Sequence, residues 1–126
     1  MEGVGFDLMM GAELMQSQNA LPANCCLIGG GAKSNLWRQI LADMCQVTMT
    51  RPNNMQHIGA FGAALMAGVG TGLIENFDKA TDIVKTDDKA VPIAENTNIY
   101  KALLPVYRKF YEQLLPAYKM LQDVKI

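Results

Sequence analysis

The chain has 126 residues and a mass of 13.8 kDa, which is room for one ordinary domain or for part of a larger one. Its 11 basic and 12 acidic residues give a formal net charge of −1, and this balance argues against a nucleic-acid or anionic-membrane surface. Half of the residues are hydrophobic and 18% are charged, so the composition predicts a buried core and not a disordered chain. The longest apolar run, Ile58–Gly70, is too short and too rich in glycine and alanine to span a bilayer.

The cysteines and the single histidine predict neither disulfides nor a metal site. Cys25 and Cys26 are neighbours, and in a strand their side chains point to opposite faces, where they are badly placed to bridge. Cys45 stands alone, and with His57 as the only histidine no zinc-ligand spacing is available. The first residues lack the basic region of a secretory signal. We therefore expect reduced thiols in a cytoplasmic protein.

The first half of the sequence predicts helix, strand, glycine turn and helix. Apolar residues recur at helical spacing over Phe6–Met15, and because no N-cap precedes them we expect that sequence upstream has been cut away. The short apolar run Cys25–Ile28 ends at three glycines and fits a buried strand. Ser34 is a typical N-cap for the helix that follows. The apolar face of that helix comprises Leu36, Trp37, Ile40, Leu41 and Met44.

Two charged residues of that helix, Arg38 and Asp43, are predicted to lie outside its apolar face. We expect Asp43 to face solvent or a neighbouring helix and assign it no acid–base role.

The second half predicts a strand and two further helices. Val47–Thr50 alternates and is β-branched, and the strand should stop at Pro52. The helix over Ile58–Leu73 carries small residues four apart, which would let another backbone approach closely. Residues 78–98 are polar and mixed, so we expect mostly loop there. Two strands do not make a stable sheet, so a further strand must come from the weakly patterned regions or from sequence outside the chain.

The last predicted helix runs from about residue 98 to residue 124. Pro116 should bend it or divide it in two. Its apolar side comprises Leu103, Tyr107, Phe110, Leu114, Tyr118 and Leu121. Core packing or contact with a second subunit in a homodimer would cover this side.

The turn between Leu27 and Ser34 is the most informative stretch. Glycines after a strand let a ligand approach the main chain, and the free N–H groups of a following helix attract an anion such as a phosphate. The Walker A pattern fails because Ala32 precedes Lys33, and the dinucleotide pattern fails at Ser34. From these residues alone, a nucleotide site and a turn with no ligand both stay open.

Several stretches, in order, resemble the FGGY family of carbohydrate kinases. Gly29–Ser34 followed by Trp37–Ile40 resembles the adenosine motif of that family. Gly59–Ala64 is similar to its small-residue helix and Tyr107–Pro116 to its C-terminal helix, while Glu2–Phe6 resembles the helix before the motif. The resemblance spans nearly all of the chain.

This resemblance implies an α/β fold that is part of an actin-like, ribonuclease-H-like ATPase domain, with a long C-terminal helix. The whole chain, residues 1–126, would be the C-terminal fragment of the second domain of such a kinase. Residues 1–90 would form the ATPase-fold portion, and residues 91–126 a loop and the C-terminal helix.

The resemblance also implies an ATP-dependent sugar kinase that phosphorylates a pentulose such as xylulose, with ATP and Mg²⁺ in the full-length parent. Gly30, Gly31 and Ser34 would contact adenosine or its α-phosphate, and Gly29 would shape the turn. The family's catalytic aspartate and most of its sugar-binding residues would lie outside this chain, so we assign no catalytic or metal-binding residue here and expect the fragment to be inactive. A non-catalytic nucleotide-binding module of the same superfamily and a plain α/β interaction domain stay open as alternatives.

Overall fold

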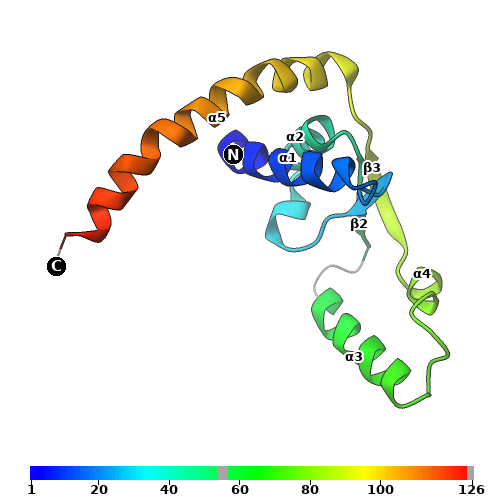
Figure 1. Ribbon diagram of the computed structural model, residues 1–126. Helices are drawn as coiled ribbons and strands as arrows, with labels where there is room; N and C mark the ends of the chain where they lie inside the picture. The colour runs from blue at the N-terminus through cyan, green and yellow to red at the C-terminus, as the bar shows by residue number, and fades with distance from the viewer. Residues whose placement is uncertain (54–56, 125–126) are drawn as a thin grey trace.

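The computed structural model describes residues 1–53 and 57–124, which form a small mixed sheet with some helices packed on it and others that project away from it (Figure 1). In chain order the elements are α1 Glu2–Ser17, β1 Asn24–Cys26, the 3₁₀ turn η1 Gly30–Lys33, α2 Asn35–Cys45, β2 Thr48–Pro52, α3 Ile58–Gly70, α4 Lys79–Ile83, β3 Thr86–Ala90 and α5 Ala94–Gln122. The predicted order of strand, glycine turn, helix, strand and helix is confirmed.

The sheet has the order β1-β2-β3. Strands β1 and β2 are parallel, with Asn24 opposite Thr48. Strand β3 pairs antiparallel with β2 and lies in the stretch that we predicted to be mostly loop, so that prediction is wrong there. The three central residues of β3 are charged, which hides the usual strand pattern but suits a strand at the edge of a sheet.

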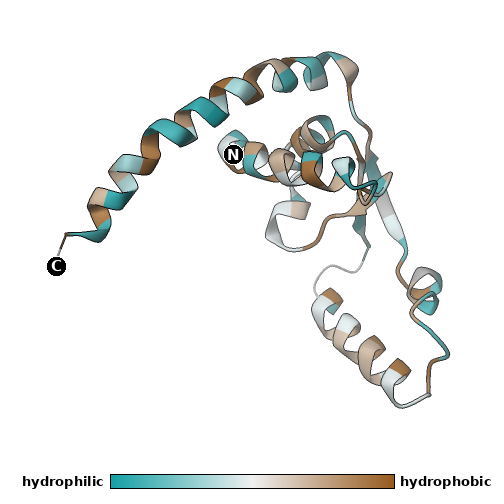
Figure 2. Cartoon of the chain, in the orientation of Figure 1, coloured by the Kyte–Doolittle hydropathy of each residue, from teal (hydrophilic) through white to brown (hydrophobic). Residues whose placement is uncertain are grey.

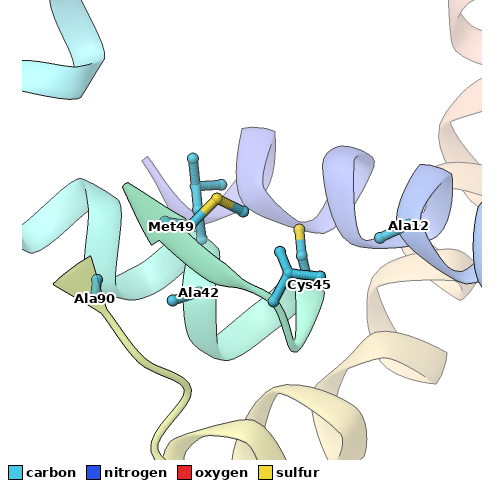
Figure 3. Close-up of a cluster of buried hydrophobic side chains, with 7 residues drawn as sticks. Ala12, Ala42, Cys45, Met49 and Ala90 are labelled. Atoms are coloured by element: carbon cyan, nitrogen blue, oxygen red, sulfur yellow. The ribbon is translucent and has the colours of Figure 1, made fainter. Parts of the chain in front are cut away.

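The main core lies where α1 and α2 pack on the sheet. Figure 3 shows Ala12 of α1, Ala42 and Cys45 of α2, Met49 of β2 and Ala90 of β3 gathered in one buried cluster. Small and flexible side chains fill this space, so the helices approach the strands closely.

The three cysteines are free thiols in the described chain, in line with the sequence. Burial, with the neighbouring Cys25 thiol as a second cause, raises the pKa of Cys45 to about 11.

A second cluster joins α1 to α5. Phe6 stacks on Tyr107 with ring centroids 4.9 Å apart and meets Tyr100 edge-on at 6.0 Å. The Tyr107 hydroxyl donates to Asp7 at 2.9 Å and the Tyr100 hydroxyl donates to Glu2 at 3.0 Å. Desolvation raises the pKa of the Tyr100 hydroxyl to about 12, and its hydrogen bond to Glu2 is the second cause. These contacts fix only the first half of α5.

Helix α5 is a single curved helix of 29 residues that contains both Pro105 and Pro116 (Figure 1). It begins at Ala94, earlier than predicted, and Pro116 does not divide it. Beyond Tyr107 its hydrophobic residues are exposed, and Figure 2 shows them alternating with hydrophilic ones along the projecting part. The expectation that the core or a second subunit covers this side stays a prediction for these residues.

The small-residue side of α3 is exposed as well. A Cβ placed on Gly59 or Gly62 would meet no atom of the described chain within 4 Å, so the predicted close approach of another backbone is not seen there. Among the helices of the described chain, none is long and apolar enough to cross a membrane.

Of the two environments expected for Asp43, solvent or a neighbouring helix, the structure shows the helix, because the residue is only 1% exposed and bonds to the start of α5. Its carboxylate accepts hydrogen bonds from the Ile93 backbone N–H at 2.7 Å, from Asn96 Nδ2 at 2.8 Å and from Gln39 Nε2 at 2.8 Å. Ile93 is the N-cap residue of α5, whose own side chain makes no capping bond. Asp43 therefore supplies, from α2, the acceptor that the start of α5 lacks.

We predict that Asp43→Ala lowers the free energy of unfolding by about 3 kcal/mol, because three partly buried hydrogen bonds from donors on α2 and α5 lose their charged acceptor. Urea unfolding followed by far-ultraviolet circular dichroism measures this loss. Asp123→Ala, at the exposed C-terminal end of α5, is the control and should change stability by less than about 0.5 kcal/mol. Equal losses for the two variants would contradict the role of Asp43.

Candidate nucleotide-binding turn

The glycine turn leaves the sheet at the end of β1. The Leu27 N–H donates to the Thr50 carbonyl at 2.7 Å, which extends the pairing with β2 one residue beyond the strand. Gly29 then has φ 85° and ψ −172°, a backbone conformation that only glycine adopts without strain. The Ala32 N–H donates back to the Gly29 carbonyl at 3.2 Å and closes the turn. The predicted role of Gly29 in shaping the turn is consistent with this geometry.

The three glycines present an exposed stretch of main chain. A Cβ on Gly29 or Gly30 would meet nothing within 4 Å, so no side chain of the described part of the protein covers them. Gly31 differs, because a Cβ there would lie 3.0 Å from Cδ1 and 3.1 Å from Nε1 of Trp37. The indole thus packs on the backbone of the turn, half-buried, and leaves the preceding glycines open.

Ser34 is the N-cap of α2, as the sequence predicts. Its Oγ accepts a hydrogen bond from the Trp37 N–H at 3.2 Å, and its carbonyl accepts one from the Arg38 N–H at 3.0 Å. The hydroxyl proton remains available to donate. The turn therefore delivers the chain directly into the N-terminus of α2, the end that favours negative charge.

Arg38 is the residue of this region that sequence reasoning missed. We expected it simply to lie off the apolar face, but it is buried, with 3% exposure. Its Nη1 donates to the Ala32 carbonyl at 3.0 Å, and its Nη2 donates to Asn35 Oδ1 at 3.0 Å. Side chains of a helix lean toward its N-terminus, so a long residue one turn after the cap reaches back to the preceding loop. That position was the only signal in the sequence.

This arrangement can hold a flat, anionic ligand. Bare glycine backbone lets a ring system lie against the main chain, and the following helix terminus attracts a phosphate. Within residues 1–53 and 57–124 there is no group of three His, Cys, Asp or Glu side chains that could hold a metal ion.

Comparison with known proteins identifies the family. Residues 1–71 match the C-terminal domain of the FGGY family of carbohydrate kinases, which is more than half of the chain. The chain belongs to this family. The resemblance seen in the glycine turn and its flanking helices is thereby confirmed.

Individual FGGY proteins match over almost the whole chain. The xylulose kinase of Bacillus subtilis is 32% identical over 112 residues, which are 88% of this chain and 22% of that protein. The structures of ligand-bound xylulose kinase and of gluconate kinase, both from Lactobacillus acidophilus, superpose with TM-scores of 0.82 and 0.80 at 23% and 24% identity. Each match covers 95% of this chain and 24% of the other, so the chain spans about a quarter of their length or less.

The structural matches confirm the predicted fold class, an α/β part of an actin-like ATPase fold with a long C-terminal helix. The assignment of Gly29, Gly30, Gly31 and Ser34 to nucleotide binding is not tested by these matches and stays a prediction.

The distinct roles of the first two glycines can be separated by alanine substitution. We predict that Gly29→Ala lowers the free energy of unfolding by about 1–3 kcal/mol, because alanine is strained at its φ and ψ. Gly30→Ala should leave stability unchanged or raise it by about 0.4–1 kcal/mol, because its φ lies outside the left-handed region and its Cβ meets nothing. Chemical unfolding of the matched pair gives both values, and a reversed order would contradict the geometry of the turn.

Proposed function

We propose that this chain is the adenosine-binding part of an ATP-dependent sugar kinase that phosphorylates a pentulose such as xylulose. The observation that carries the proposal is the exposed main chain of Gly29 and Gly30 in the turn that leads into the N-terminus of α2, in a chain of the FGGY family. In this proposal Gly30, Gly31 and Ser34 contact the adenosine or its α-phosphate, and Gly29 sets the turn.

Phosphoryl transfer from ATP to a sugar hydroxyl requires positioning and neutralisation of charge more than covalent chemistry by the protein. The turn would supply positioning on the nucleotide side. Mg²⁺ would arrive with the phosphates of ATP, and its protein ligands would be sought outside this chain. A pentulose substrate is supported by xylulose kinases among both the sequence and the structural relatives. The division into an ATPase-fold portion, residues 1–90, and a C-terminal portion, residues 91–126, is part of the same proposal.

The test of the nucleotide site is Gly30→Asp. The added carboxylate would occupy the bare side of the turn and repel phosphate, so we expect the Kd for ATP to rise at least about tenfold, a change of ~1.4 kcal/mol. Isothermal titration calorimetry measures the Kd, and thermal unfolding shows that the variant is folded.

Gly11→Asp is the matched control, because Gly11 is also exposed and its Cβ would meet nothing within 4 Å, but it lies in α1. It should bind ATP as the unchanged chain does. Equal affinity for Gly30→Asp and the unchanged chain would sink the proposed site, as would a chain that binds no ATP.

We predict that the 126-residue chain does not release ADP in the presence of xylulose and MgATP. In the proposal the catalytic base and most of the sugar pocket belong to sequence outside the chain, so a bound nucleotide has no activated acceptor. A coupled ADP-release assay measures the rate. ATP binding is measured in parallel to show that the site is intact. Sugar-dependent turnover would overturn this part of the proposal.

A further inference from the structure

We propose that Arg38 is a positioning residue for the nucleotide site, which holds the glycine turn in its open conformation through the Ala32 carbonyl. The inference rests on the proposed function for its ligand, but its structural part concerns only how the turn is held.

The Arg38 guanidinium joins three segments of the chain. Nη1 donates to the Ala32 carbonyl of η1 at 3.0 Å, and Nη2 donates to Asn35 Oδ1 at 3.0 Å and lies 3.5 Å from Asp88 Oδ2 of β3. Arg51 of β2 binds the same Asp88 oxygen at 3.2 Å. The turn is therefore fixed to the opposite edge strand of the sheet through one side chain.

The environment of Arg38 indicates that this link is specific. The side chain is 4% exposed, Ala32 is fully buried, and Arg38 Nε is buried without a hydrogen-bond partner in the described chain. A buried guanidinium with an unpartnered N–H costs free energy that a packed apolar side chain would avoid. What arginine alone supplies here is a planar fork whose terminal nitrogens reach a carbonyl and a carboxylate together.

The position of Ala32 in the turn links Arg38 to the open glycine backbone. Ala32 comes directly after the three glycines, and its N–H and carbonyl are both used, the first by Gly29 and the second by Arg38. A Cβ on Gly29 or Gly30 would meet no atom of the described chain within 4 Å, so no packing on that side holds them. The conformation of the bare backbone is thus set by its two ends, at β1 and at Ala32, and Arg38 fixes the second end.

The experiment compares ATP binding by the unchanged chain and by the variants Arg38→Met, Arg38→Lys and Arg51→Met. Arg38→Met keeps the bulk but loses the bond to Ala32, and we expect its Kd for ATP to rise about tenfold. Arg38→Lys keeps the positive charge, but all three of its donors lie on one nitrogen and cannot reproduce the spacing of the guanidinium fork, so it should give an intermediate Kd. Arg51→Met removes the other partner of Asp88 but leaves the bond between Arg38 and Ala32, so its Kd should stay within about twofold of the unchanged chain.

A second readout separates positioning from general stability. We expect the backbone amide resonances of Gly29, Gly30 and Gly31 to shift or broaden in Arg38→Met without nucleotide, and to stay in place in Arg51→Met. A merely structural role would lower the midpoint of thermal unfolding and leave both these resonances and the Kd, measured well below that midpoint, unchanged. Trp37 is the only tryptophan and packs on Gly31, so its emission reports the same change.

The outcomes are distinguishable. A folded Arg38→Met variant with an unchanged Kd and unchanged glycine resonances overturns the inference. If the unchanged chain binds no ATP, the proposed function fails, and the glycine resonances alone decide whether Arg38 holds the turn. If Arg38→Met does not fold, Arg38→Gln, whose shorter side chain cannot span to the Ala32 carbonyl, is judged by the same two readouts.

Discussion

The burial of α2 against the sheet is the constraint on which the rest of the structure depends. Leu41, Ala42 and Cys45 of this helix pack on β2 and β3, while Met44 faces the cluster that joins α1 and α5. Helix α1 also contributes to both clusters, through Ala12 in the first and Phe6 and Met9 in the second. Because α2 is held on both sides, the direction of its N-terminus is fixed, and so is the place where the glycine turn must end.

The turn itself needs few residues once that end point is set. Gly29 provides the one backbone conformation that other residues resist, and Ser34 begins the helix. Trp37 packs over Gly31 and leaves the two glycines before it open. The proposed nucleotide site needs a surface that is bare and yet ordered, and the restraints that the described chain shows lie at the two ends of the glycine stretch.

Much of this could be predicted from the sequence, because strong local signals carry it. A serine before an apolar helical pattern, or glycines after an apolar run, have the same meaning in most proteins. The third strand was missed for the opposite reason. Residues 86–90 form a strand because β2 lies beside them, and their own charged side chains give no sign of it. Pairing of this kind depends on segments distant in sequence.

The partners of Arg38 and Asp43 could not be predicted for the same reason. Periodicity placed them off the apolar face of α2, and polar residues in that position usually meet water. Both are instead buried, because other segments of the chain bring groups that complement them. Nothing within the helix identifies Ala32 or Ile93 as partners, so only the tertiary structure could show the bonds.

The positions of Arg38 and Asp43 along α2 are unfavourable with respect to the helix dipole. A helix favours acidic side chains near its N-terminus and basic ones near its C-terminus, by about 0.3–1 kcal/mol each. Arg38 lies near the N-terminal end and Asp43 near the C-terminal end, so each stands at the end of the helix that favours the opposite charge. The helix dipole therefore explains neither charge, and their bonds within α2, from Gln39 to Asp43 and from Arg38 to Asn35, are worth only about 0.2–0.5 kcal/mol each.

Their bonds to other segments must therefore account for them. Arg38 fixes the turn that enters α2, and Asp43 caps the helix α5 that packs beside it. The two residues use one rigid helix to hold a loop at one end and a second helix at the other. In this arrangement the open glycine backbone and the first half of α5 are positioned by the same element. A change in how α2 packs on the sheet would therefore displace both.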